Sequence, residues 1–233
     1  MIIEALNWQN VTITQIRDES SGAKTFRIQT ETAYSFVAGQ HLIARITLQN
    51  GFTAVRDYSF SSAPSSGVIE ITVGRAIGGE VSQWFHEVCK LGDTIEITPA
   101  FGTHFTWNST MKTSTVLIGG GTGITPLMSI FREHRDQKAT SPMKLLYSAR
   151  NFDEICFKDE LLDTKDAHCI LTRPSADWQG LSGRVSIDRL TPYVSSTNHF
   201  YICGPYTFVA DIKKMLLSEL LVPSSSIKVE QFD

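Results

Sequence analysis

The sequence lacks paired cysteines, clustered histidines and an excess of charge of either sign. Its 233 residues include six histidines that are dispersed along the chain, and no two cysteines form a Cys-x-x-Cys pair. A disulfide framework, a thiolate metal site and a histidine metal site are therefore not expected. Three of the four cysteines are interpreted as small buried hydrophobic residues, namely Cys89, Cys156 and Cys169.

Long hydrophobic runs are also missing. The longest apolar stretches fall far short of the roughly 20 residues that a membrane-spanning helix needs. The first ten residues lack the basic start, apolar middle and cleavage site of a secretory signal. A net charge of -3 and an isoelectric point near 6.1 provide no basic field for nucleic acid. We therefore expect a cytoplasmic protein with neither a membrane nor a nucleic acid as partner.

What the first part of the chain does contain is a series of short β-type segments separated by turn residues. This rhythm predicts a closed antiparallel barrel. One helix is expected within it, over residues 82–90, with Ser82 as its N-cap and Gly92 beyond its end. The predicted strands cover residues 11–17, 25–30, 41–48, 56–61, 68–73 and 94–98.

After a polar stretch, the pattern changes to strands that alternate with helices. Such alternation predicts a doubly wound parallel sheet of the α/β class. The predicted strands cover residues 115–118, 144–148, 168–172, 200–203 and 227–232, and the predicted helices cover 126–136, 155–162 and 206–221. The sequence thus predicts two domains, an antiparallel β-barrel over residues 1–105 and an α/β doubly wound parallel sheet over residues 106–233.

A glycine-rich turn joins the first strand and the first helix of the second domain. At this junction, free backbone N–H groups and the helix dipole can bind an anion. Glycine lets the backbone approach a phosphate closely, so a pyrophosphate site is predicted, with a purely structural turn as the alternative. The predicted binding residues are Gly120, Gly121, Thr122, Gly123 and Pro126.

Two motifs in the barrel region point to a second phosphate-bearing ligand. Arg56-Asp57-Tyr58-Ser59 places a cation, an aromatic ring and a hydroxyl at one strand end. Alone, it could equally be an ordinary strand with a solvated arginine. Gly78-Gly79-Glu80-Val81-Ser82 opens the predicted barrel helix and offers another anion site. Arg56 and Ser82 are therefore predicted to hold one pyrophosphate between them.

With these motifs in this order, the chain resembles the ferredoxin-NADP reductase superfamily nearly from end to end. In that family the Arg-x-Tyr-Ser strand and the Gly-Gly-x-x-Ser helix start hold a flavin, usually FAD, on the barrel. The Gly-x-Gly-x-x-Pro turn, here residues 121–126, holds the nicotinamide nucleotide. Cys203-Gly204-Pro205 matches the family motif beside the nicotinamide. The resemblance implies FAD and NADPH or NADH as cofactors.

The resemblance also implies roles for single residues. Arg56 neutralises an FAD phosphate, Tyr58 packs against the isoalloxazine and Ser59 lies near its reactive N5 edge. Thr122 and Cys203 border the nicotinamide, and Ser59 and Cys203 are the catalytic positions. Tyr58 as an ordinary strand aromatic and Cys203 as a core thiol remain the alternatives. Further implied cofactor-binding residues are Asp57, Gly78, Gly79, Val81, Ser82, Gly204, Pro205 and Glu230; Glu230 matches only loosely and is as consistent with a surface carboxylate.

The choice of nucleotide depends on the second strand of the sheet domain. This strand ends in Ser148-Ala149-Arg150 and not in the acidic residue that would bond a ribose 2′-hydroxyl. Arg150, with Arg173 after the third strand, could bind a 2′-phosphate, which favours NADPH. NADH remains the alternative, because Asp153 and Glu154 lie close by.

The sequence contains no Cys-x4-Cys-x2-Cys run for a plant-type iron–sulfur cluster, so a one-electron relay would be external. The predicted function is hydride transfer between NAD(P)H and bound FAD, followed by electron transfer to a separate ferredoxin or flavodoxin. The alternatives are an NAD(P)H:free flavin reductase, the reductase component of an oxygenase and a non-catalytic regulatory flavoprotein subunit.

Overall fold

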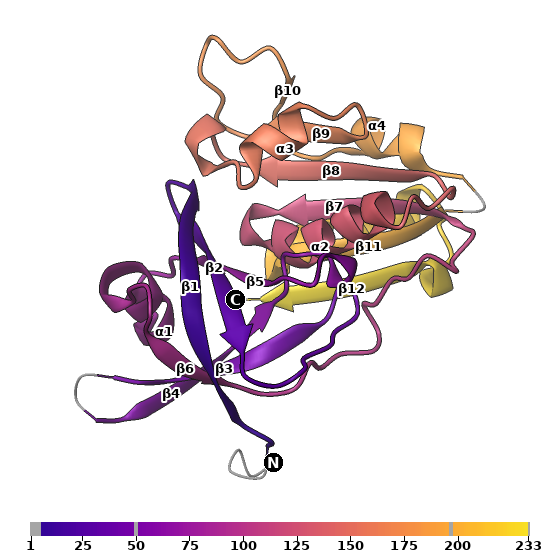
Figure 1. The fold of residues 1–233 in the computed structure, drawn as a ribbon. Helices are drawn as coiled ribbons and strands as arrows, with labels where there is room; N and C mark the ends of the chain where they lie inside the picture. Colours follow the sequence, from indigo (N-terminus) through magenta and orange to yellow (C-terminus); the bar gives the residue numbers. More distant parts are fainter. Residues whose placement is uncertain (1–5, 49–50, 196–197, 233) are drawn as a thin grey trace.

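A computed structural model describes residues 6–48, 51–195 and 198–232. The chain forms two domains, an antiparallel six-stranded sheet followed by a parallel six-stranded sheet (Figure 1). This arrangement confirms the predicted fold class. The outer ends of the two predicted domains, residues 1 and 233, lie outside the described residues. The boundary at 105/106 falls in the connection between the two sheets and stays a prediction.

The first sheet has the strand order β4-β3-β6-β1-β2-β5. Its two outer strands are joined by the Phe60–Ile71 bridge and by Ser61 N, which donates to Glu70 O (2.8 Å). The sheet therefore closes on itself as a barrel, with alternate side chains such as Val11, Ile13 and Phe26 in its core. The strands are β1 (Gln9–Ser20), β2 (Ala23–Thr30), β3 (His41–Thr47), β4 (Thr53–Ser59), β5 (Ile69–Gly74) and β6 (Thr94–Ile97).

The barrel helix begins earlier than predicted. Helix α1 (Glu80–Gln83) continues into a π-helical turn (Trp84–Val88), and its N-cap is Gly79. The prediction of Ser82 as N-cap is therefore wrong. Gly78 adopts a left-handed φ of 75°, which turns the chain into the helix two residues sooner. The Ser82 hydroxyl instead closes this turn, because it accepts from Ala76 N (3.1 Å) and donates to Gly79 O (2.9 Å).

The second sheet is parallel throughout, with the order β10-β9-β8-β7-β11-β12. Alternate residues of β7 face opposite layers: Leu117 packs in the cluster that contains α2 and α3, and Val116 packs with α4 and α5. The elements are β7 (Ser114–Gly120), α2 (Ile124–Asp136), β8 (Met143–Ala149), α3 (Lys158–Leu162), β9 (Ala167–Leu171), β10 (Leu181–Ser182), α4 (Ile187–Leu190), β11 (Asn198–Pro205), α5 (Tyr206–Lys214) and β12 (Ile227–Phe232).

Three details of this domain differ from the sequence prediction. Helix α3 begins only at Lys158, because Phe157 before it has a left-handed φ of 55°. Helix α5 ends at Lys214 and is followed by a π-helical turn, Met215–Glu219. Strand β10 and helix α4 were not predicted, since each is only two to four residues long.

Strand order in this sheet reverses between β7 and β11. The chain leaves β7 through α2 to reach β8 on one side, whereas β11 lies on the other side of β7. The carboxyl ends of strands at such a switch point form a crevice in which α/β proteins bind ligands. The glycine-rich turn follows β7 at this point, and Cys203-Gly204-Pro205 ends β11 beside it.

Helix α2 joins the two domains. Ser129 Oγ donates to Ser62 O (2.7 Å), and Arg132 Nη1 donates to Ser61 O (2.8 Å). Both Ser65 N (2.9 Å) and Ser65 Oγ (2.7 Å) donate to the Glu133 carboxylate. These bonds hold the barrel loop after β4 on the sheet domain and so place the switch point next to the barrel.

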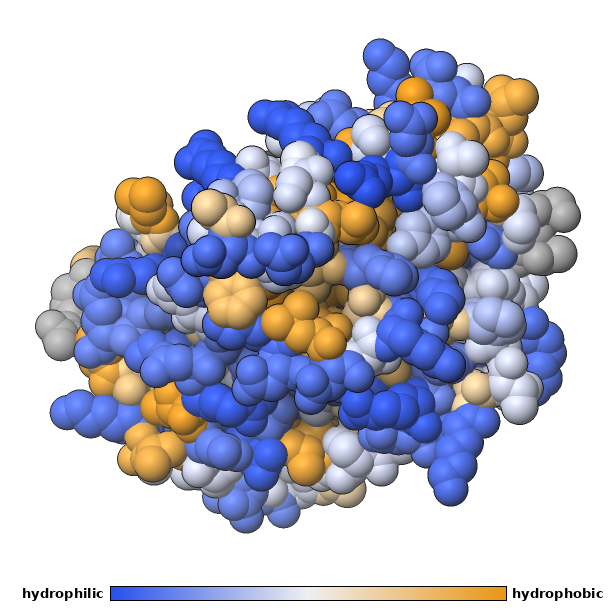
Figure 2. Space-filling model, turned by 90° about the horizontal axis from the view of Figure 1, so that it is seen from above, coloured by the Kyte–Doolittle hydropathy of each residue, from blue (hydrophilic) through white to orange (hydrophobic). Residues whose placement is uncertain are grey.

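The surface seen from above is mostly hydrophilic, with hydrophobic residues in smaller groups (Figure 2). Within the described ranges, no helix combines the length and the hydrophobicity needed to cross a bilayer.

Candidate functional site

A cleft of about 980 Å³ lies between the two domains. Its size is at the upper end of the range of about 300–1,000 Å³ that is usual for small-molecule sites. The cleft brings together most of the residues that the sequence singled out. From the barrel come Arg56, Asp57, Tyr58, Ser59, Gly79, Val81 and Ser82; from the sheet domain come Gly121, Thr122, Pro126, Arg150, Cys203 and Glu230.

Other predicted residues do not line this cleft. For several glycines the structure shows a packing reason. A Cβ on Gly120 or Gly204 would lie 2.8 Å from the ring of Phe208, and a Cβ on Gly123 would lie 2.3 Å from Cys203 O. These glycines let α2, α5 and the strand ends pack closely. The predicted residues outside the cleft lining are Gly78, Gly120, Gly123, Ser148, Arg173, Gly204 and Pro205.

Strand β4 presents a cation and an aromatic ring to the cleft. Arg56 is exposed, and Nη1 donates to Val55 O (2.7 Å). Within the described residues, Arg56 has no carboxylate partner, so its other N–H groups can bind an anion. Tyr58 packs edge-on against Phe85, with ring centroids 5.4 Å apart. Burial raises the pKa of Tyr58, so this phenol stays neutral.

The glycine-rich turn contributes a different surface. Gly121 has a left-handed φ of 55°, and nothing lies within 4 Å of the position that its Cβ would take. Its backbone therefore opens into the cleft. Thr122 instead contacts the barrel, because a Cβ on Gly74 would lie 2.5 Å from Thr122 Cγ2. Gly74 and Thr122 thus mark where the two domains meet inside the cleft.

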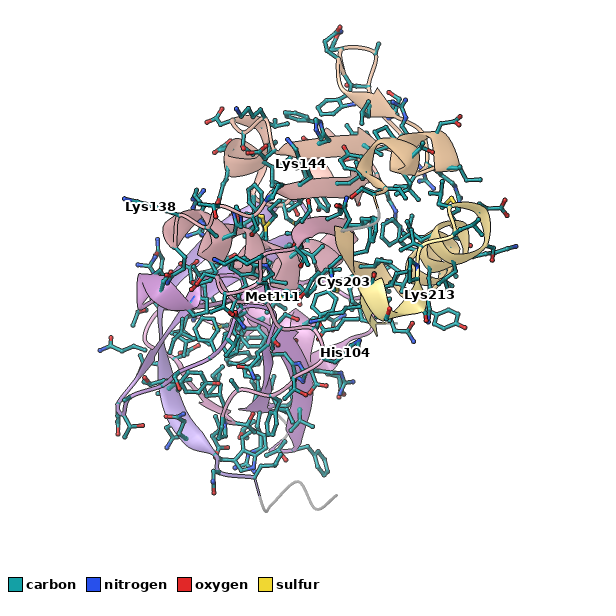
Figure 3. The ribbon with its side chains drawn as sticks, turned by 90° about the vertical axis from the view of Figure 1, so that its right-hand side faces the viewer. His104, Met111, Lys138, Lys144, Cys203 and Lys213 are labelled. Carbon is teal, nitrogen blue, oxygen red and sulfur yellow. The ribbon has the colours of Figure 1, made fainter. Side chains whose placement is uncertain are left out.

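Cys203 and Glu230 lie in register on the neighbouring parallel strands β11 and β12. Figure 3 shows Cys203 at the junction of the barrel and the sheet domain. Burial raises the thiol pKa of Cys203 well above its ordinary value, with the nearby Glu230 carboxylate as a further cause. Burial also raises the pKa of Glu230 to about 7. The thiol is therefore no nucleophile, whereas the Glu230 carboxyl can gain or lose a proton near neutral pH.

Sequence reasoning missed part of the cleft. His41 lines it because β3 pairs with β4 in the register His41–Ser59. The hairpin pairing of these strands was the signal that could have found it. Glu154 and the β1–β2 turn at Ser20 and Ser21 line its far end, which only the tertiary structure shows. The remaining lining residues not assigned to the site are Gly22, Thr72, Gly74, Arg75, Ala76, Thr125, Cys156, Gln231 and Phe232.

The residues present fit two phosphate-bearing, ring-containing ligands. The barrel side offers an unpaired guanidinium, a neutral aromatic ring and the start of α1, and the sheet side offers an open glycine backbone at the start of α2. Both sides open into one cleft, so the two ligands would meet there. The fold and this cleft define a two-domain protein that brings two dinucleotides together.

Comparison with known proteins agrees with this description. The family model "Oxidoreductase FAD-binding domain" matches residues 10–106, and "Oxidoreductase NAD-binding domain" matches residues 117–214. The ferredoxin–NADP reductase B of Sorangium cellulosum is 29% identical, over 86% of this chain and 87% of the relative. One component protein of the 1,2-phenylacetyl-CoA epoxidase of Escherichia coli K12 is 26% identical, over 97% of this chain and 68% of the relative.

Solved structures show the same fold. The flavohem-like FAD/NAD-binding domain of nitric oxide dioxygenase from Vibrio cholerae has a TM-score of 0.87 at 24% identity, covering 96% of this chain and 98% of that one. A ferredoxin NADP+ reductase from Neisseria gonorrhoeae with bound FAD and NADP has a TM-score of 0.79 at 23% identity, covering 96% and 98%. Some relatives are longer, and the chain spans 53% of flavohemoprotein A of Dictyostelium discoideum.

The chain therefore belongs to the ferredoxin-NADP reductase-like family of FAD- and nicotinamide-nucleotide-dependent oxidoreductases. Its cofactors are FAD and a nicotinamide nucleotide.

Proposed function

We propose that this protein passes reducing equivalents from NADPH, through bound FAD, to a separate one-electron carrier of the ferredoxin or flavodoxin type. The observation that carries the proposal is the single cleft, which both the Arg56–Ser59 strand of the barrel and the Gly121 turn of the sheet domain line. FAD supplies a ring system that can take up a hydride and release electrons singly. The protein supplies binding, alignment and control of protons.

On the barrel side, Arg56 and the turn that ends in Ser82 hold the FAD phosphates. Arg56 contributes free guanidinium donors, and the backbone N–H groups at the start of α1 contribute further donors. Val81 and Ser82 are buried and keep this turn fixed. Tyr58 offers a neutral ring face for the isoalloxazine, held in place by Phe85. Ser59, opposite His41, is placed at the reacting edge.

On the sheet side, the Gly121 turn holds the nucleotide pyrophosphate at the start of α2. Thr122 and Cys203 then border the nicotinamide, where the two domains touch. Cys203 acts as a neutral, buried wall, since its thiol pKa is raised. Glu230 beside it can hold a proton at neutral pH.

The preference for NADPH follows from a row of arginines. Arg150, Arg173 and Arg184 follow the neighbouring parallel strands β8, β9 and β10 at their carboxyl ends. Their backbones run side by side, because Arg173 N donates to Arg150 O (2.6 Å) and Gly183 N donates to Leu171 O (2.9 Å). All three side chains are exposed, and none has an acidic partner in the described part of the chain. Guanidinium forks of this kind suit a 2′-phosphate.

Arg184→Ala and Arg173→Ala test this preference. Each is expected to raise the KM for NADPH by about tenfold, the equivalent of one charged hydrogen bond of about 1.5 kcal/mol, and to leave the KM for NADH unchanged. Arg189→Ala is the matched control on the nearby helix α4. Equal effects on both nucleotides would contradict the proposed 2′-phosphate site.

The acceptor is proposed from the relatives. Reductases that serve ferredoxins and oxygenases are among them, including the ferredoxin reductase of carbazole 1,9a-dioxygenase, whose structure has a TM-score of 0.83 at 20% identity. The residues described contain no group of three metal-binding side chains, which agrees with an external relay. An oxygenase component is the second candidate, because the component protein of the phenylacetyl-CoA epoxidase aligns over 97% of this chain.

Stopped-flow reduction under nitrogen tests the proposal as a whole. Purified protein should be yellow, and its flavin absorbance should bleach faster with NADPH than with NADH. The reduced protein should then reoxidise rapidly with ferredoxin or flavodoxin and slowly with free flavin. Yellow protein that neither nucleotide reduces would support the non-catalytic regulatory role instead. Fast turnover with free flavin alone would support the free flavin reductase.

A further inference from the structure

The turn between β1 and β2 reaches from the barrel to the sheet domain. In Figure 1 this indigo hairpin rises from the barrel beside α3. At its tip, Ser21 N donates to Asp153 O (2.9 Å), and the Cys156 thiol donates to Ser20 Oγ (3.5 Å). From the barrel side, Arg75 N donates to Gly22 O (2.8 Å). Partners from both domains therefore fix the hairpin tip at the domain junction.

The hairpin tip, residues 20–22, is a thin wall between two hollows. All three of its residues line the 980 Å³ cleft, on the stretch that also holds Arg150 and Glu154. Ser20 and Ser21 also line a second groove of about 650 Å³ on the other side. The second groove offers no free cation of its own at Arg132, which is bonded to Glu160 (2.6 Å). The hairpin tip therefore has its open ligand-binding side toward the cleft.

The wall opposite the hairpin tip is also rigid. Asn151 Oδ1 accepts from both Asp153 N and Glu154 N (3.1 Å each), and Asn151 Nδ2 donates to Glu154 Oε1 (2.9 Å). The two sides of this part of the cleft are thus held at a fixed separation. A nucleotide that extends from the Gly121 turn to Arg150 has to pass between them.

We infer that the hairpin tip of the barrel is part of the nucleotide site and binds the adenosine ribose-phosphate portion opposite Arg150. The inference rests on the proposed function. Ser21 is exposed, and its hydroxyl forms no hydrogen bond with any described residue, so it can donate to a ribose or phosphate oxygen. The FAD-binding domain thereby takes part in nucleotide recognition at the end of the nucleotide that is remote from the reacting ring.

Ser21→Glu tests the inference, with Ser225→Glu as a matched control at an exposed serine that does not line the cleft. The dissociation constant of NADP+ is measured by titration calorimetry on FAD-loaded protein, without turnover. We expect S21E to weaken binding by at least about tenfold, because a carboxylate placed against phosphates repels them. S225E should bind as the wild type does. FAD content and the reduction rate at saturating NADPH should be unchanged in both variants.

A second readout follows accessibility directly. In S21C, NADP+ should protect the introduced thiol from alkylation, whereas a thiol introduced by S225C should react at the same rate with and without nucleotide. Wild-type binding by S21E, absent protection of S21C or loss of FAD from S21E would each overturn the inference. Failure of the proposed function is distinguishable, because wild-type protein would then not be reduced by either nucleotide.

Discussion

At the scale of single residues, the cleft combines a free cation with groups that burial keeps neutral. Arg56 is exposed, whereas burial raises the pKa values of Tyr58 and Cys203. The barrel side therefore carries a local positive charge against which only an anionic part of a ligand would be favoured. The ring-binding parts are neutral and apolar, as a hydride transfer between two aromatic systems requires.

Arg56→Ala should lower FAD retention. One charge-assisted bond to a phosphate is lost, which corresponds to about 1.5–3 kcal/mol, or roughly a 10- to 150-fold weaker complex. The ratio of flavin to protein absorbance after gel filtration measures this. Arg56→Lys keeps the charge but not the planar fork, and should lie between wild type and alanine. Unchanged flavin content in R56A would contradict the assignment of Arg56 to the FAD phosphate.

Glu230 should make the stability of the protein depend on pH. Burial raises its folded-state pKa to about 7, above an ordinary value of 4.5. The folded state therefore binds more protons than the unfolded state between these two pH values, and stability should fall as pH rises from about 4.5 to 7. This shift corresponds to roughly 3 kcal/mol.

Urea unfolding at several pH values checks this. Glu230→Gln should remove this contribution, so that the variant gains stability relative to wild type as pH rises toward 7.5. A difference between the two proteins that stays constant with pH would contradict the raised pKa.

At the scale of elements, sequence pattern was sufficient where local periodicity decides the structure. The short strands from 11 to 98 and the later strand–helix alternation predicted both sheets. Pattern failed where tertiary contacts decide. Gly120 and Gly204 read as part of phosphate and nicotinamide motifs, yet their lack of a Cβ makes room for the Phe208 ring. The hairpin tip and Glu154 could not be placed in the cleft from sequence, because no local pattern indicates which distant loops meet.

The glycines of the β7–α2 turn should separate into two kinds on mutation. Gly123→Ala places a Cβ 2.3 Å from Cys203 O, so backbone has to move, and we expect a loss of stability of about 3 kcal/mol. Gly121→Ala meets no atom and should cost only about 1–2 kcal/mol for its left-handed φ. Thermal unfolding measures both values.

Gly121→Val extends this test to the ligand. Its branched side chain would project into the proposed pyrophosphate position, so the protein should stay yellow but be reduced more slowly by nucleotide. Loss of flavin from G121V would place the turn at the other cofactor. A G123A protein as stable as wild type would contradict the packing role of that glycine.

At the scale of the whole molecule, the two domains act as one unit because α2 is bonded to the barrel. Arg132 is central to this interface. Its guanidinium donates to Ser61 O (2.8 Å) on the barrel and to Glu160 (2.6 Å) beside α3, and it lies 4.7 Å from the ring centroid of Phe157. A fixed domain arrangement keeps the flavin strand and the Gly121 turn in one cleft. Loss of this contact should therefore affect reduction by nucleotide more than it affects flavin binding.

Arg132→Ala should cost about 2 kcal/mol of stability, as expected for charged hydrogen bonds at a partly buried site. Arg135→Ala is the matched control, because Arg135 pairs with the same Glu160 from an exposed position and should contribute less than about 1 kcal/mol. Urea unfolding followed by flavin fluorescence and by circular dichroism should give coincident curves for wild type and R135A. In R132A the two curves should separate, since the domains then unfold less cooperatively. Flavin content of R132A should stay normal while the rate of flavin reduction by NADPH falls. An R132A protein that behaves like R135A in both measurements would show that Arg132 does not couple the two domains.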